Sequence, residues 1–292
     1  MFGNEARERT NERVSTVSVL ICLIMTSAAR TACGWRGNAT ASGNASTVSS
    51  TATTTTHVRE FMRLREVLLR EMNVTASRRT SHAASVRVMR RTIPEGTALV
   101  SELTEEDLKT PEEFYLVEFK NPDKRAVVAR GKRLVDIAGR ASTSGGGGGA
   151  SATEEVSVFT SDDDEVEKFL NSPGVRFHRM VHAYTLAGDA FDVGDFTVRV
   201  CRAERQSGAY AGTILDLSYK ATNDARTATA ALREYAAHAT SVINASAETE
   251  SERGSFVFTD LAASCPPSVY HAPAGELQTA ISYVDALRSL KR

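Results

Sequence analysis

The chain has 292 residues, with 35 Lys and Arg residues against 36 Asp and Glu residues, so its formal net charge is −1. This balance excludes a broadly basic nucleic-acid-binding protein. A hydrophobic fraction of 41% supports a sizeable core and excludes collagen, coiled coils and fully disordered chains. The four cysteines form no C-x-x-C pair, so the sequence indicates no zinc-binding or redox motif.

The N-terminal region predicts a leader without a core. The apolar run Val14–Met25 is shorter than the ~20 residues of a membrane-spanning helix. It could form the centre of a secretory signal, with Ser27 and Ala29 as the small residues of a cleavage site, but the preceding residues mix Arg with Glu. Residues 26–56 are almost entirely Ala, Ser, Thr, Gly and Asn, which cannot bury a core. We therefore predict a disordered leader over residues 1–56.

Secretion stays open as an alternative, because four N-x-S/T sequons occur, at Asn38, Asn44, Asn73 and Asn244. Glycan acceptors of this kind belong to secreted chains. Three of the four lie where Ala, Ser and Thr are abundant, so matches by chance are expected.

Helical and alternating apolar patterns then predict a helix and a first β block. The helix spans His57–Met72, and strands are expected over Ser85–Ile93, Phe114–Lys120, Arg125–Arg130 and Lys132–Ile137. Five consecutive glycines make residues 141–152 a surface loop.

A second β block and two helices follow the glycine loop. Ser161 is the expected N-cap of a short helix whose first turn holds Asp162, Asp163 and Asp164. Strands are expected over Val175–Tyr184, Asp189–Val193, Asp195–Arg202 and Ala211–Lys220, and amphipathic helices over Arg226–Ile243 and Gly275–Leu290.

This order predicts an α+β fold. A large antiparallel β-sheet or barrel, made of two β-meanders, is flanked by an N-terminal helix and two C-terminal helices. We expect one domain over residues 57–292, because each β block alone has too few strands to close a core.

The sequence offers few groups for catalysis. It contains no G-x-S-x-G nucleophile motif, and the glycine run lacks the Lys and Ser/Thr of a phosphate-binding loop. His178 and His182 would lie ~13 Å apart along a strand, too far to share a metal ion. Glu118 and Lys120 keep only part of the E-x-E-x-K strand of triphosphate tunnel enzymes, whose divergent members stay a further alternative. We therefore expect no catalytic residue, metal or cofactor.

Charged side chains on the second β block are expected to face solvent. They are Arg176, Arg179, Arg199 and Arg202. Such residues commonly keep a β surface soluble.

Four segments together resemble subunit 20 of Mediator of RNA polymerase II transcription. They are Arg130–Val135, the Gly-Asp-Phe-x-Val-Arg-Val strand within Val193–Val200, Leu215–Tyr219 and Ile281–Val284 in the terminal helix. The likeness extends over roughly residues 57–292, and its most specific part is the Gly-Asp-Phe-x-Val-Arg-Val strand. The paralogous subunit 18 has a related barrel and is an alternative. The Phe177–Phe191 segment faintly resembles that subunit.

The resemblance implies a non-enzymatic coactivator subunit in the nucleus, within the head module of Mediator. Its implied partners are subunit 18, as a paired barrel, and a helix of subunit 8. No direct contact with nucleic acid, membrane or a small-molecule substrate is implied. The pairing surface is expected to combine apolar β surface with the terminal helix.

Overall fold

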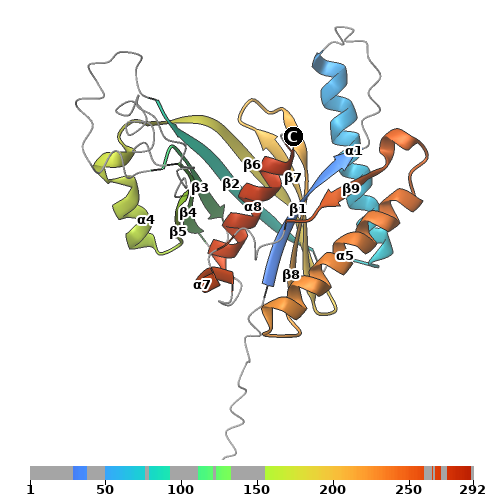
Figure 1. Ribbon diagram of the computed structural model, residues 1–292. Coiled ribbons are helices and arrows are strands. Elements are labelled where there is room, and N and C mark those ends of the chain that lie inside the picture. Colours follow the sequence, from blue (N-terminus) through green and yellow to red (C-terminus); the bar gives the residue numbers. More distant parts are fainter. Residues whose placement is uncertain are drawn as a thin grey trace, which may run out of the picture.

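The computed structural model describes residues 29–37, 50–75, 79–92, 111–120, 123–132, 155–259, 265, 267–270 and 275–290. The strands within these residues form one antiparallel sheet in the order β5-β4-β3-β2-β6-β7-β8-β1-β9 (Figure 1). They are β1 (Ala29–Gly37), β2 (Thr80–Arg91), β3 (Glu113–Lys120), β4 (Asp123–Lys132), β5 (Glu155–Thr160), β6 (His178–Val193), β7 (Phe196–Arg205), β8 (Tyr210–Tyr219) and β9 (Gly254–Val257). The helices are α1 (Ser50–Glu71), α4 (Asp163–Leu170), α5 (Ala225–Ala245), α7 (Pro267–Tyr270) and α8 (Glu276–Leu290), with 3-10 turns at Pro173–Val175 and Glu250–Glu252.

The predicted α+β fold with a large antiparallel sheet is confirmed. The expectation of a closed barrel is wrong for the described residues, where β5 and β9 are the two unjoined edges of the sheet. Both β-meanders belong to this single sheet, because β2 pairs with β3 on one side and with β6 on the other.

Helix α8 lies inside the curve of the sheet and contacts both β1 and β4 (Figure 1). These two strands are far apart in the strand order, so the sheet must bend around the helix for both to reach it. Every residue of α8 from Gln278 to Leu287 is buried. The terminal helix is therefore part of this chain's own core, and the expectation that it forms the pairing surface is corrected.

The opposite face of the sheet is covered by α1 and α5 at one end and by α4 at the other (Figure 1). Val198 and Val200 of β7 and Leu215 and Leu217 of β8 pack against these helices, as their alternation predicts. On the other side of these strands, Cys201, Ala203, Ile214 and Asp216 are buried beneath α8, and Arg199 is partly buried.

Strand β1 corrects the expectation of a disordered leader, because Ala29–Gly37 lies between β8 and β9 with most of its residues buried. Its small side chains let α8 approach closely. A Cβ atom added at Gly34 would lie 2.7 Å from Ser289 Oγ and 3.1 Å from the carbonyl oxygen of Ala286. The small residues that suggest a flexible tail are therefore needed in β1 so that α8 can pack closely against it. Residues 1–28 and 38–49 lie outside the described residues.

Several predicted boundaries also change. The two expected strands over Val175–Tyr184 and Asp189–Val193 are one strand, β6, and β4 continues through Gly131 to Lys132. Asp162, not Ser161, caps α4, because its carboxylate accepts hydrogen bonds from the backbone N–H groups of Asp164 and Glu165. Residues 133–137 and the glycine loop lie outside the described residues.

Candidate functional site

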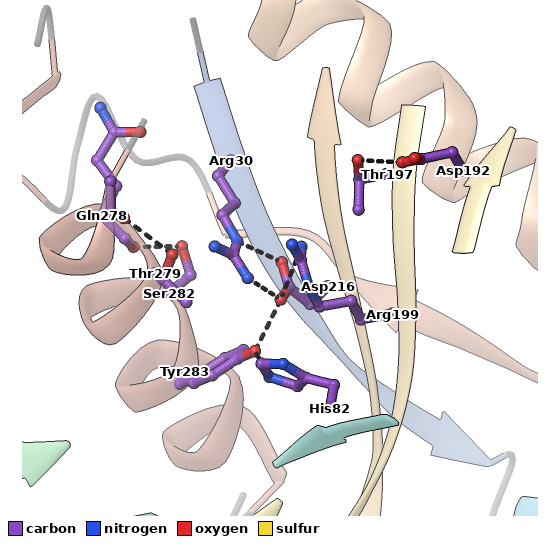
Figure 2. Close-up of polar contacts among 11 residues, drawn as sticks. Arg30, His82, Asp192, Thr197, Arg199, Asp216, Gln278, Thr279, Ser282 and Tyr283 are labelled. Carbon is purple, nitrogen blue, oxygen red and sulfur yellow. Dashed lines mark hydrogen bonds and ion pairs between the residues drawn. The ribbon is translucent and has the colours of Figure 1, made fainter. Parts of the chain in front are cut away.

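A buried polar cluster lies where α8 crosses the inner face of the sheet (Figure 2). Its members are Arg30 on β1, His82 on β2, Arg199 on β7, Asp216 on β8 and Tyr283 on α8. Arg199 and Asp216 are directly opposite each other in the β7–β8 register, and Arg30 comes from the neighbouring strand. The cluster therefore joins three adjacent strands to the helix that fills the sheet.

Asp216 is the centre of the cluster and is fully buried. The Arg30 guanidinium donates from Nε to Oδ1 at 2.9 Å and from Nη2 to Oδ2 at 2.6 Å. The Tyr283 hydroxyl donates to Oδ2 at 2.7 Å, and Arg199 Nη1 lies 3.6 Å from the same oxygen. Both carboxylate oxygens are thus occupied by partners from this chain.

The charges around Asp216 decide its protonation. Burial by itself raises the pKa of a carboxyl group, but Arg30, Arg199 and the hydrogen bond from Tyr283 lower the pKa of Asp216 more, to well below its ordinary value. Burial, together with the Asp216 charge, raises the pKa of Tyr283 well above its ordinary value. An ionised aspartate facing a protonated tyrosine is therefore the stable pair.

His82 extends the cluster, with its Nε2 atom 2.7 Å from the Tyr283 hydroxyl. The single hydroxyl proton of Tyr283 goes to Asp216, because an ionised carboxylate can only accept. His82 must therefore donate from Nε2, which leaves Nδ1 as an acceptor. Burial, aided by Arg199 and Arg30 and opposed by Asp216, lowers the pKa of His82 to about 4, so the ring is neutral at pH 7.

Three of the five members of the cluster line a cavity of about 600 Å³. Arg30, His82 and Arg199 line it together with Phe119 and with residues of β6 such as Ala190. Side chains at the start of α8, including Thr279, complete its wall (Figure 2). Five strands, β1, β2, β3, β6 and β7, and the start of α8 supply the lining residues, so the shape of the cavity depends on the position of α8 against the sheet.

The residues that the sequence singles out lie elsewhere. His178 is buried and its Nε2 lies 2.8 Å from the carbonyl oxygen of Pro111, whereas His182 is exposed further along β6. Glu118 pairs with Arg87 at 2.9 Å and accepts a hydrogen bond from Ser85. Within the described residues, no group of three or more His, Cys, Asp or Glu side chains is placed to hold a metal ion.

Arg199 corrects the expectation that the arginines of the second β block all face solvent. It points to the inner face of the sheet beside Asp216, with 19% of its side chain exposed. Arg202, three residues along the same strand, instead pairs with Glu204 at 2.9 Å and lies outside the cavity lining. The single signal for the site in the sequence is a charged residue, Asp216, between the apolar residues Leu215 and Leu217.

The asparagine of one sequon, Asn244, forms hydrogen bonds within the folded chain. The Asn244 side chain donates from Nδ2 to the carbonyl oxygen of Gly254 at 2.9 Å and accepts from the Gly254 N–H at 3.0 Å. A glycan on Nδ2 would disrupt this pair. Asn73 is exposed, and Asn38 and Asn44 lie outside the described residues. Among the helices that the structure describes, none has the length and apolarity needed to cross a membrane.

The neutral state of His82 gives a pH-dependent stability. The folded-state pKa of about 4 lies below the ordinary value of 6.5, so the unfolded chain takes up a proton first as the pH falls. We expect this group to remove about 2 kcal/mol of the free energy of unfolding between pH 7.5 and pH 5. The variant His82→Gln keeps a donor to Tyr283 but does not titrate, so urea unfolding at the two pH values should show a smaller loss than the wild type.

The matched control is His238→Gln, since His238 is exposed on α5. This variant should lose stability on acidification as the wild type does. A His82→Gln variant with the wild-type loss would contradict the neutral, buried histidine. The buried His178, whose pKa burial also lowers, supplies a background loss common to all three proteins.

Neither a family model nor a curated protein matches the sequence. Among solved structures, the chain is similar to one from the Schizosaccharomyces pombe Mediator head module, at 11% identity and a TM-score of 0.32, covering 75% of this chain and 96% of that one. It is also similar to a putative adenylate cyclase from Vibrio parahaemolyticus, at 14% identity and a TM-score of 0.30, covering 73% and 87%. The PH1012 protein from Pyrococcus horikoshii OT3 matches at 9% identity and a TM-score of 0.31, covering 72% and 89%. At these TM-scores none of the three establishes a shared fold.

Proposed function

We propose that the chain is a non-enzymatic subunit of the Mediator head module, acting in the nucleus as a protein-interaction scaffold in RNA polymerase II transcription. The proposal rests on the sequence resemblance to subunit 20. Its expected partners are subunit 18, packed beside the sheet, and a helix of subunit 8.

The observation that supports it is the convergence of three of the four resembling segments. Arg199 belongs to the Gly-Asp-Phe-x-Val-Arg-Val strand, Asp216 to Leu215–Tyr219 and Tyr283 to Ile281–Val284. These three side chains, far apart in sequence, meet in one buried cluster. The segments that carry the resemblance therefore contribute to one structural centre of this fold. Of the fourth segment, residues 130–132 end β4 and residues 133–135 lie outside the described residues.

The chemistry of the cluster supports a structural role. The Asp216 carboxylate accepts from Arg30 and Tyr283, and the Tyr283 hydroxyl is itself held between Asp216 and His82. A general base or nucleophile must have a free lone pair that faces its substrate. Here Asp216 and Tyr283 use their polar atoms on partners within the chain, and their hydrogen bond joins α8 to the sheet.

The candidate contact with a partner lies on β6. Met180 and Val181 are neighbours on this strand with 45% and 38% of their surface exposed, and they are two of the three exposed large apolar residues in the described part of the chain. The third, Met62, is on α1. These two side chains offer apolar surface that a partner could cover.

The test is co-expression with subunit 18 and subunit 8 of the same organism, followed by size-exclusion chromatography. The wild-type chain should elute with both partners. The double variant Met180→Glu with Val181→Glu should weaken the complex at least about tenfold, because two charges would enter an apolar contact. Met62→Glu is the matched control and should leave the complex intact. Separate elution of the wild-type chain would contradict the proposal.

A further inference from the structure

Strand β6 extends beyond its neighbour β7, so part of one of its edges has no partner strand. β2 pairs with β6 from His178 onward, whereas β7 pairs with it only from Tyr184 onward. The last backbone hydrogen bond on the β7 side runs from the N–H of Gln206 to the carbonyl oxygen of Ala183. In the described part of the chain, no strand pairs with residues 178–182 on this side, which we call the open edge of β6.

The register of β6 with β2 shows which backbone groups face the open edge. The N–H of Thr92 donates to the carbonyl oxygen of Phe177 at 2.9 Å, so these two residues are a hydrogen-bonded pair. Hydrogen-bonded and non-hydrogen-bonded pairs alternate along an antiparallel ladder. Met89 and Met180, three pairs further along, are therefore a non-hydrogen-bonded pair. The N–H and carbonyl groups of Met180 thus point away from β2, toward the open edge.

The side chains along the open edge are exposed. All four residues of Arg179–His182 are exposed, and Met180 and Val181 keep 45% and 38% of their surface in contact with solvent. Unpaired backbone next to apolar side chains is a template for another strand. The register shift between Val88 and Met89 puts a β-bulge here, and bulges limit how far pairing extends along an edge. A short segment therefore fits this edge better than a long strand.

The charges beside the open edge favour an acidic occupant. Arg179 Nη1 donates to the carbonyl oxygens of Arg176 and His178, and Arg205 lies opposite Tyr184 at the end of β7. Among the residues that the structure describes, no carboxylate forms an ion pair with Arg179 or Arg205. A second copy of β6 would bring the same arginines close to one another, and like charges repel. A segment of another protein with carboxylates would instead balance them.

We propose that the open edge of β6 binds a short, extended, acidic segment of a partner protein by strand addition. The backbone of the segment pairs with the N–H and carbonyl groups of Met180, and its apolar side chains cover Met180 and Val181. Its carboxylates face Arg179 and Arg205. This inference rests on the proposed function for the presence of a partner at this surface, and it adds the chemistry and the binding mode of the segment.

The experiment is NMR titration of the ¹⁵N-labelled full chain with the peptide acetyl-Glu-Val-Thr-Val-Glu-amide. Binding should be saturable, should shift the amide signal of Met180 and should slow hydrogen exchange at that amide, because its N–H gains an acceptor. The charge-reversed peptide acetyl-Lys-Val-Thr-Val-Lys-amide should bind at least about tenfold more weakly.

Two N-methylated forms of the acidic peptide test strand addition itself. One carries methyl groups on the backbone nitrogens of both valines, and the other carries a methyl group on that of the threonine. Alternate residues of a strand direct their N–H groups to opposite edges. One of the two forms should therefore bind at least about tenfold more weakly, and the other should bind as the unmodified peptide does. Equal binding of the two forms would overturn strand addition.

Variants of the chain place the binding on the open edge. Met180→Pro removes the N–H that faces this edge without removing a hydrogen bond to β2, and it should weaken peptide binding at least about tenfold. Met180→Leu keeps the N–H and the apolar side chain and should bind as the wild type does. Arg179→Glu should also weaken binding about tenfold, which keeps the test valid if Met180→Pro does not fold. Arg59→Glu, at an exposed position on α1, makes the same charge change and should not.

Absence of saturable binding by the acidic peptide would overturn the inference. Equal binding of the acidic and basic peptides, or equal losses in Arg179→Glu and Arg59→Glu, would overturn it as well. These titrations contain no Mediator subunit. A peptide that does not bind to a chain that elutes with subunits 18 and 8 would therefore overturn this inference alone, whereas separate elution of the chain contradicts the proposed function.

Discussion

Replacing Asp216 with Asn should lower the free energy of unfolding by about 3–5 kcal/mol. The variant keeps the shape of the side chain but removes the charge that faces Arg30 and Arg199, so two guanidiniums remain in the cluster without their counter-charge. Removing one partner of a buried ion pair lowers the free energy of unfolding because the other charge stays buried without compensation. Thermal melting should show a drop of about 10 °C for a chain of this size.

The control for this prediction is Asp192→Asn. Asp192 pairs with Lys220 at 2.7 Å, but 64% of its side chain is exposed, so its loss should cost no more than about 1 kcal/mol. Adding Arg30→Met to Asp216→Asn should recover part of the stability, because one of the uncompensated charges is removed. A drop no larger than that of Asp192→Asn would show that the cluster does not hold the fold.

Replacing Val284 with Asp should abolish the folded state or cost more than about 4 kcal/mol. Val284 is fully buried in the cluster of apolar residues that α8 shares with β2, β3, β4 and β6. An unpaired carboxylate has no partner there, and total stability of a domain is only about 5–15 kcal/mol. Circular dichroism and size-exclusion chromatography should show an unfolded or aggregated chain.

The same substitution at an exposed valine is the matched control. Val181→Asp on β6 places the charge where 38% of the side chain reaches solvent, and melting should change by less than about 1 kcal/mol. Wild-type melting of Val284→Asp would contradict the placement of α8 inside the sheet.

Periodicity in the sequence predicts most helices and strands because each has one apolar side that is buried. The alternation of Phe196, Val198 and Val200 follows from packing against the outer helices. The helical spacing of Leu232, Ala236 and Ala239 follows from packing of α5 against the sheet and α1. Such patterns predict the type and order of elements. They do not predict that Cys201, Ile214 and Asp216, on the other side of β7 and β8, are buried as well.

The polar cluster could not be predicted from local patterns, because its members are distant in sequence. Arg30 comes from a stretch whose small residues indicate disorder, and those residues are small because β1 is pressed between α8 and the outer layer. Tyr283 lies on α8, which its sequence predicts to have one buried stripe, whereas the curved sheet buries Gln278–Leu287 on all sides. The same curvature explains why strand counts suggest a barrel although the described sheet is open.

The most direct test of the central claim is affinity purification of the C-terminally tagged chain from cells, with mass spectrometry of the proteins that co-purify. The account predicts recovery of other Mediator head subunits, with subunits 18 and 8 among them. Recovery of no Mediator subunit, together with a glycosylated form of the chain in the culture medium, would contradict it.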